Sequence, residues 1–75
     1  NYSQLRAFHA VAEAGSFTGA ADKLCLTQPA ITLQLKALQE HYGLNLLCRR
    51  GHHIELTEAG ESLFVLTKRL FSVAR

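Results

Sequence analysis

Several features that mark other classes of protein are absent from this sequence. No uninterrupted apolar run approaches the roughly 20 residues that a membrane-spanning helix needs. Residues 1–15 contain no basic segment followed by an apolar one, so we expect a cytoplasmic location without membrane association. Two cysteines in 75 residues are too few for a disulfide scaffold. The formal net charge is only +2, which by itself supports nucleic-acid binding weakly.

Motifs of catalysis and of metal binding are missing as well. The sequence has no glycine-rich phosphate loop, nucleophile motif or set of clustered carboxylates. A zinc site would need a CxxC pair or two suitably spaced histidines, and Cys25, Cys48, His52 and His53 provide neither. We therefore expect no enzyme, metal site or cofactor in this domain. The cysteines are then small core or turn residues, and the histidines at positions 9 and 41 are surface or packing residues.

Capping residues and glycines predict three helices in the first half of the chain. Ser3 is a suitable N-cap and Gly15 a suitable terminator for the first. Ser16 caps a second helix, ending near residue 24, whose alanines allow close approach of a neighbour. Thr27 as N-cap and Pro29 in the first turn predict a third helix over residues 28–42. Two helices joined by so tight a turn are typical of a helix-turn-helix, although the usual turn glycine is absent.

The predicted third helix has two different faces. Its apolar face, which should enter the core, comprises Ile31, Leu35, Leu38 and Tyr42. The opposite face and the exposed N-terminal end comprise Gln28, Pro29, Thr32, Leu33 and Lys36. The polar members of this second set can present hydrogen-bonding groups or charge to a partner.

Residues 44–56 change character and predict a β-hairpin. Short apolar strands at residues 46–48 and 54–56 flank a basic loop that comprises Arg49, Arg50, Gly51, His52 and His53. We therefore expect an exposed, positively charged hairpin tip.

Thr57 caps a final predicted helix over residues 58–75, with Glu58 and Glu61 in its first turn. Its apolar stripe can be covered by the first helix of the same domain or by the same helix of a second copy. The stripe extends further than the thin core of a 75-residue domain should reach, so we favour the second copy. The expected dimerisation residues are Leu63, Leu66, Leu70, Phe71 and Val73.

This order of elements predicts a mainly α winged helix-turn-helix, with a three-helix core, a two-stranded β wing and a long C-terminal helix. Residues 1–57 would form the DNA-binding domain and residues 58–75 the linker and dimerisation helix. A helix such as the third fits the major groove of double-stranded DNA, which is about 12 Å wide. There Thr27 would hold a phosphate and Gln28 an adenine. Thr32 would form a hydrogen bond or contact a thymine methyl group, and Lys36 would bind a guanine or a phosphate. The hairpin tip at residues 49–53 would lie on the backbone or in the adjacent minor groove, with Arg49 and Arg50 placed to contact phosphates or that groove.

The chain resembles the DNA-binding domain of LysR-type bacterial transcriptional regulators over essentially its whole length. The similarity is carried by FTGAADKLCLTQPAITLQLKALQE at residues 17–40, by Gly43 and by LLCRRGHHIELTEAG at residues 46–60. Within these segments FTGAA, TQPAIT, the spacing to Arg49 and LTEAG are the most specific.

The resemblance implies a cytoplasmic regulator in which this domain precedes a larger effector-binding domain that binds a small-molecule co-inducer. It implies homodimers paired through the last helix, and tetramers of the full-length protein, on inverted-repeat sites in double-stranded DNA. By position, Thr27, Gln28, Pro29 and Thr32 match the DNA-contacting start of the family's recognition helix, and Arg49 matches its wing arginine.

Two alternatives remain open from the sequence. Family members commonly carry a basic or polar residue where this chain has Leu33, so this side chain either contacts a thymine methyl or is a scattered exposed apolar residue. A winged helix can also bind protein instead of DNA. Such a module would lack a continuous positive surface across residues 27–36 and 49–50, and its partner binding would not depend on salt.

Overall fold

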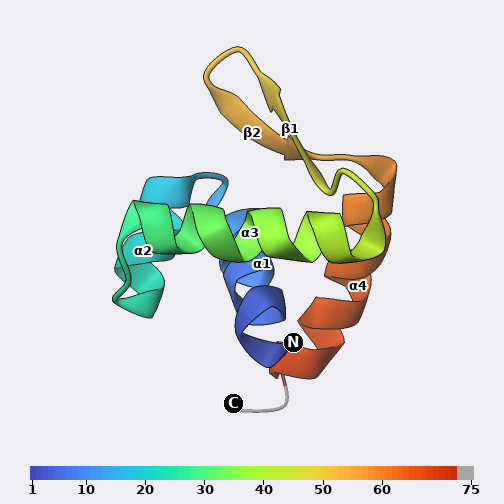
Figure 1. The fold of residues 1–75 in the computed structure, drawn as a ribbon, viewed down its shortest axis with the longest axis horizontal. Helices are drawn as coiled ribbons and strands as arrows, with labels where there is room; N and C mark the ends of the chain where they lie inside the picture. Colours follow the sequence, from blue (N-terminus) through green and yellow to red (C-terminus); the bar gives the residue numbers. More distant parts are fainter. Residues whose placement is uncertain (73–75) are drawn as a thin grey trace.

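The computed structural model describes residues 1–72 and has the expected winged helix-turn-helix architecture (Figure 1). Within the described residues the elements are α1 (Tyr2–Ala14), α2 (Phe17–Leu24), α3 (Gln28–Tyr42), β1 (Leu47–Arg50), β2 (His53–Leu56) and α4 (Glu58–Ser72). Val73, predicted to take part in dimerisation, lies outside the described residues, as do positions 74 and 75.

The N-cap prediction for the first helix was wrong by two residues. Asn1 is the N-cap of α1, and its side chain accepts a hydrogen bond from the backbone nitrogen of Gln4 at 3.0 Å. The Gln4 side chain in turn accepts a hydrogen bond from the amino group of Asn1 at 3.1 Å. This reciprocal capping box satisfies two donors at once, which a cap at Ser3 could not do.

The other predicted caps are confirmed. Ser16 caps α2 by accepting from the backbone nitrogen of Gly19, and Gly15 and Gly43 end α1 and α3 in the left-handed conformation. In the turn between α2 and α3, Cys25 takes over the left-handed position that glycine usually fills, with φ 57°. The turn is closed by a hydrogen bond from the backbone nitrogen of Leu26 to the oxygen of Ala21, 2.9 Å long.

The core is centred on α1, which α3 crosses, with α2 and α4 on either side (Figure 1). As predicted, the small side chains of α2 and the apolar face of α3 are buried. The buried apolar residues are Ala7, Phe8, Ala10, Val11, Ala20, Ala21, Ile31, Leu35, Leu38 and Leu46. Tyr42 was expected among them but is 51% exposed, because α3 has passed beyond α1 at its last turn and its end lies beside α4 (Figure 1).

The hairpin forms an antiparallel two-stranded wing, but its strands extend further toward the tip than predicted. Arg49 pairs with Ile54 and Arg50 with His53, so both arginines belong to β1 and only Gly51 and His52 form the turn. Gly51 adopts φ 63°, which permits so tight a turn. The two arginines are therefore held by a ladder and their side chains point to opposite faces.

A compact junction fixes the wing and α4 to α3. The side-chain oxygen Oε1 of Gln39 accepts hydrogen bonds from the backbone nitrogens of Leu46 and Leu47, at 2.7 and 3.2 Å. Thr57 caps α4 by accepting from the backbone nitrogen of Gly60 at 3.1 Å, and its own backbone nitrogen donates to the oxygen of Leu46. Gly60 is required here because a Cβ at this position would lie 2.0 Å from that same oxygen.

The apolar stripe of α4 is divided between two environments. Thr67 is 1% exposed and faces α1, and the Phe71 ring packs 5.0 Å from the His9 ring and 5.5 Å from the Tyr2 ring. Leu66 and Leu70, by contrast, are 59% and 50% exposed. The first alternative therefore holds for one side of the stripe, which α1 covers, while pairing of the exposed side with a second copy stays a prediction.

Candidate nucleic-acid interface

The N-terminal end of α3 lies beside α2, and several of its polar and apolar side chains are exposed. Thr27 begins the helix by accepting a hydrogen bond from the backbone nitrogen of Ala30 at 3.2 Å, and Pro29 occupies the first turn. Four of the predicted contact residues line one shallow, open hollow: Gln28, Pro29, Thr32 and Leu33. Leu33 is 67% exposed, so it is not used by the core.

Lys36 is exposed further along the same helix and extends this surface toward the middle of α3. The spacing of Gln28, Thr32 and Lys36 by four residues places them along one side of the helix. The surface therefore combines an amide, a hydroxyl, an ammonium group and two apolar side chains. These groups can distinguish base edges, because amides and cations form hydrogen bonds and apolar groups contact methyl groups.

Gln28 does not extend freely into solvent. Its side-chain nitrogen Nε2 donates a hydrogen bond to the hydroxyl oxygen of Thr18, 3.0 Å away on α2. The first residue of α3 is thus tied by its side chain to the first turn of α2. Thr18 belongs to the FTGAA segment, but its spacing from Gln28 did not predict this contact.

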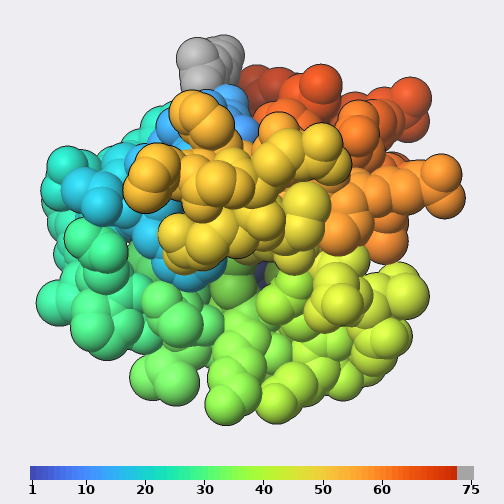
Figure 2. Space-filling model, turned by 90° about the horizontal axis from the view of Figure 1, so that it is seen from above, coloured from blue at the N-terminus to red at the C-terminus, as the bar shows by residue number. Residues whose placement is uncertain are grey.

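The wing brings Arg49 to the same region. A cavity of about 220 Å³ has Thr18 and Gln28 on the helical side and Arg49, His52 and Ile54 on the wing side. Figure 2 shows the wing, in yellow and orange, above the green α3 and beside the blue segment that leads into α2. His52 belongs to the hairpin tip at residues 49–53 that was predicted to contact the backbone or the minor groove, and it lines this cavity beside Arg49.

Arg50 has a different environment from Arg49. Its Nε atom forms an ion pair with Glu55 Oε1 at 3.0 Å on the wing, where both side chains are well exposed. An exposed pair of this kind contributes little stability, but it offsets part of the Arg50 charge. The interface roles predicted for Arg49 and Arg50 are thus physically unequal, with Arg49 nearer to α3.

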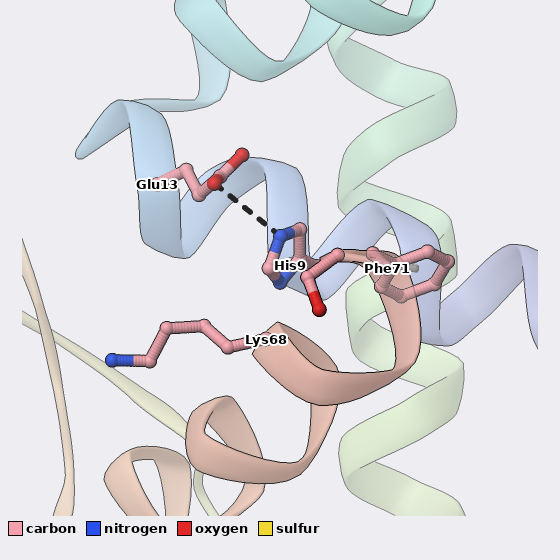
Figure 3. Close-up of a pocket in the computed structure, with 5 residues that line it drawn as sticks. His9, Glu13, Lys68 and Phe71 are labelled. Carbon is pink, nitrogen blue, oxygen red and sulfur yellow. Dashed lines mark ion pairs between the residues drawn. The ribbon is translucent and has the colours of Figure 1, made fainter. Parts of the chain in front are cut away.

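A second polar cluster, between α1 and α4, has the composition of a catalytic triad. His9 Nδ1 lies 2.9 Å from the hydroxyl of Thr67, and His9 Nε2 lies 3.4 Å from Glu13 (Figure 3). Thr67 is 1% exposed and its hydroxyl also lies 3.1 Å from the Phe64 carbonyl oxygen, as a donor to it. A buried hydroxyl cannot reach a substrate, so this cluster joins two helices, and His9 has the packing role that was expected of it.

Glu13 also binds Lys23 of α2 at 2.6 Å, whereas Lys68 lies over the Phe64 ring. The cluster borders a cavity of about 300 Å³ lined by residues of α1 and α4. Figure 3 shows the Lys68 side chain extending away from the histidine and the carboxylate. The Glu13–Lys23 ion pair links α1 to α2, and the His9–Thr67 contact links α1 to α4.

The cysteines lie apart from both clusters. Cys25 is exposed in the turn between α2 and α3, which agrees with the predicted role as a turn residue and not with that of a core residue. Cys48 was expected in the core or a turn but is an exposed residue of β1, because strand alternation turns Leu47 inward instead. Among residues 1–72, no helix is both long and apolar enough to cross a membrane.

Comparison with known proteins defines the relationship of the whole chain. The family model described as bacterial regulatory helix-turn-helix protein, lysR family, matches residues 2–61. The chain belongs to the LysR family. It is 48% identical over 61 residues to the RuBisCO operon transcriptional regulator of Allochromatium vinosum, covering 81% of this chain and 20% of that protein. It is 46% identical over 68 residues to the glycine cleavage system transcriptional activator of Escherichia coli K12, covering 91% of this chain and 22% of the activator.

Solved structures of LysR-family regulators have the same fold. The BenM DNA-binding domain in complex with catB site 1 DNA has a TM-score of 0.91 and 38% identity, covering 99% of this chain and 83% of that one. The complex of the CbnR DNA-binding domain with DNA has a TM-score of 0.87 and 42% identity, covering 99% and 85%. This LysR-family chain spans about a fifth of the length of the two named regulators.

Proposed function

We propose that this LysR-family domain binds specific sequences in double-stranded DNA. α3 lies in the major groove, with Thr27 at a phosphate and Gln28, Pro29, Thr32, Leu33 and Lys36 along the bases and backbone. The wing, through Arg49 and to a lesser degree Arg50, lies on the adjacent backbone or minor groove. The solved complexes of the BenM and CbnR domains with DNA support this assignment.

One observation carries the proposal: the N-terminal side of α3 is exposed, and the wing arginine shares a cavity with its first residue. Gln28 belongs to both the open hollow on α3 and the cavity that contains Arg49. A duplex against this face meets hydrogen-bonding groups from α3 and a cation from the wing together. This combination gives base contacts for specificity and phosphate contacts for affinity.

We further propose that two copies pair through the open side of α4. Leu66 and Leu70 are exposed one turn apart, and Val65 beside them is 51% exposed. An isolated helix face with three large exposed apolar residues would be covered by a partner helix in a dimer. Leu63 and Phe71, which are half-buried against their own domain, would contribute at the edge of this contact.

The regulator that contains this domain would act in the cytoplasm as a dimer, or a tetramer at full length. Dimer symmetry requires an inverted-repeat site whose half-sites lie about one helical turn, or a multiple of it, apart. Any small-molecule co-inducer would bind in an effector domain outside these 75 residues. Transcription regulation without enzymatic activity agrees with the names of the relatives.

Selection of bound sequences from a random duplex pool, with the purified chain, tests the proposal. We expect an inverted repeat to emerge, with a thymine enriched where the apolar Leu33 meets a methyl group. A pool that stays random after repeated rounds would contradict sequence-specific binding. A protein partner bound independently of salt would support the alternative use of the fold.

Substitution of Gln28 by alanine tests base reading directly. We expect the loss of about 1–3 kcal/mol at one or two base pairs and a relaxed preference there, because one bidentate contact to adenine disappears. Binding is measured by fluorescence anisotropy on the selected duplex and on single-pair variants of it. Equal losses on the selected and the scrambled duplex would remove Gln28 from base readout.

A further inference from the structure

A hydrogen bond between the side chains of two exposed residues, Thr18 and Gln28, joins α2 to α3. Both Thr18 and Gln28 are exposed, yet the Gln28 nitrogen Nε2 donates a hydrogen bond to the Thr18 hydroxyl at 3.0 Å. The two residues are ten positions apart and belong to different helices. A surface glutamine that orders itself in this way loses side-chain freedom before any ligand arrives.

Thr18 is a firm anchor for such a contact. It is the second residue of α2, directly after a helix start that the Ser16 hydroxyl fixes by accepting from Gly19. The next turn of α2 is anchored in the core by Ala20 and Ala21, which are 0% and 6% exposed. Threonine is also branched at Cβ, which restricts its own side-chain rotation. The hydroxyl therefore holds a defined position relative to the first turn of α3.

The hydrogen bond leaves the useful part of the Gln28 amide available. Nε2 carries two hydrogens, and Thr18 accepts only one of them. The other hydrogen and the oxygen Oε1 remain as a neighbouring donor and acceptor. This is the pair that binds N7 and N6 of adenine in the major groove.

We infer that Thr18 is a positioning residue for base recognition: its hydroxyl holds the Gln28 amide in the orientation that accepts adenine. This inference rests on the proposed function, because it concerns how Gln28 reads a base. Thr18 acts through Gln28 and makes no base contact itself. Because the amide is ordered before binding, the correct base pair is bound with a smaller loss of side-chain entropy, and the difference in affinity from a wrong base pair increases.

Replacement of Thr18 by valine tests this, since valine keeps the shape and branching and removes only the hydroxyl. Discrimination between the selected duplex and a duplex altered at the Gln28-read pair should fall about three- to tenfold, the effect of one lost hydrogen bond. The Thr18→Ser variant keeps the hydroxyl and should retain discrimination. Ser3→Ala removes a hydroxyl from the same second position of α1 and should change nothing.

A double-mutant cycle separates positioning from an independent contact. In a Gln28→Ala background, Thr18→Val should produce no further loss of discrimination, because the amide it positions is gone. The dependence of affinity on salt should be the same for Thr18→Val and the unaltered protein. If Thr18→Val lowers the thermal midpoint, Thr18→Ala, a better helix former, replaces it with the same expected result.

Three outcomes would overturn the inference, and they can be told apart. Equal affinity loss on every duplex with a weaker salt dependence makes Thr18 a phosphate ligand instead. Unchanged discrimination in Thr18→Val, with a loss in Gln28→Ala, rejects the positioning role and leaves the proposed function intact. Unchanged discrimination in both variants rejects base reading by Gln28 and with it the positioning role of Thr18, whereas sequence-specific binding by the domain is tested separately by the selection from the random pool.

Discussion

Alanine in place of Gly60 should destabilise the domain although it favours helix formation. A Cβ at this position would lie 2.0 Å from the carbonyl oxygen of Leu46, whereas real Cβ atoms keep at least 3.0 Å from such neighbours. The obstacle is backbone, and Leu46 is itself 3% exposed and held by a hydrogen bond to the Gln39 side chain. The same oxygen accepts from the backbone nitrogen of Thr57, so moving it also disturbs the cap of α4.

The magnitude of the Gly60→Ala effect follows from two opposing contributions. Overpacking against fixed backbone costs about 3 kcal/mol, at the upper end of the usual range. The higher helix propensity of alanine and the lower entropy of the unfolded chain together stabilise the variant by about 1 kcal/mol. The net decrease in the free energy of unfolding is therefore about 2 kcal/mol. For a domain of this size such a loss lowers the melting temperature by about 8–16 °C.

Thermal and urea unfolding followed by circular dichroism measures this loss. Ser62→Ala is the matched control, because it raises helix propensity at an exposed position of the same helix. The control should melt at or slightly above the temperature of the unaltered protein. An equal or higher melting temperature for Gly60→Ala would refute the close approach of α4 to Leu46.

Three further outcomes are expected. Arg49→Ala should weaken binding to every duplex and lower the slope of log affinity against log salt concentration by about one unit. Arg50→Ala should have a smaller effect, because Arg50 already forms an ion pair on the wing. Equal slopes for the two variants would contradict this ranking. The double substitution Leu66→Glu and Leu70→Glu should give monomers in sedimentation velocity with a nearly unchanged melting temperature, since both side chains are exposed; a surviving dimer would move the pairing surface elsewhere. Gln39→Ala should lower the free energy of unfolding in urea by about 1–3 kcal/mol, because two backbone donors lose their acceptor. Gln39→Glu keeps the acceptor oxygens and should retain most of the stability. Equal losses in the two variants would show that the acceptor does not matter.

The helices of this domain were predictable because their ends are encoded locally. Ser16, Thr27 and Thr57 each cap a helix through a contact three residues along the chain. The mistake at the first helix has the same local character, since Asn1 and Gln4 form a capping box that outcompetes a cap at Ser3. Local rules fail only when two suitable caps lie close together.

The details of the wing and of the apolar stripe of α4 were harder to predict, because they depend on residues distant in sequence. The strand bounds follow from the pairing of residues 47–50 with 53–56, and this pairing carries both arginines out of the predicted loop. The inward side of α4 is set by the Thr67 contact with His9, 58 residues earlier. A polar pair of this kind leaves no mark in a hydrophobic pattern, so the sequence could not show that Phe71 faces α1.

The composition of the candidate DNA-binding surface was predictable from the sequence, but its geometry was not. Exposure of Gln28, Thr32, Leu33 and Lys36 follows from helical periodicity once the core face is known. The contact of Gln28 with Thr18 requires the crossing of α2 and α3, which periodicity does not contain. The sequence therefore identifies Thr18 only as part of a segment shared with the family. Its contact with Gln28 is seen only in the structure.

The junction around Leu46 determines how the proposed DNA-binding surface on α3 and the proposed pairing surface on α4 are oriented to each other. Gln39 of α3 accepts hydrogen bonds from the backbone at the start of β1. The backbone nitrogen of Thr57, which caps α4, donates to the oxygen of Leu46, and Gly60 of α4 lies close against the same oxygen. Both sets of contacts involve the backbone of the buried Leu46, and Gln39 also binds the adjacent Leu47, so α3, the wing and α4 cannot rotate independently without breaking them. A dimer formed through α4 would then hold its two copies of α3 at a fixed separation, so loosening this junction with Gln39→Ala should broaden the spacing of selected half-sites as well as lower stability.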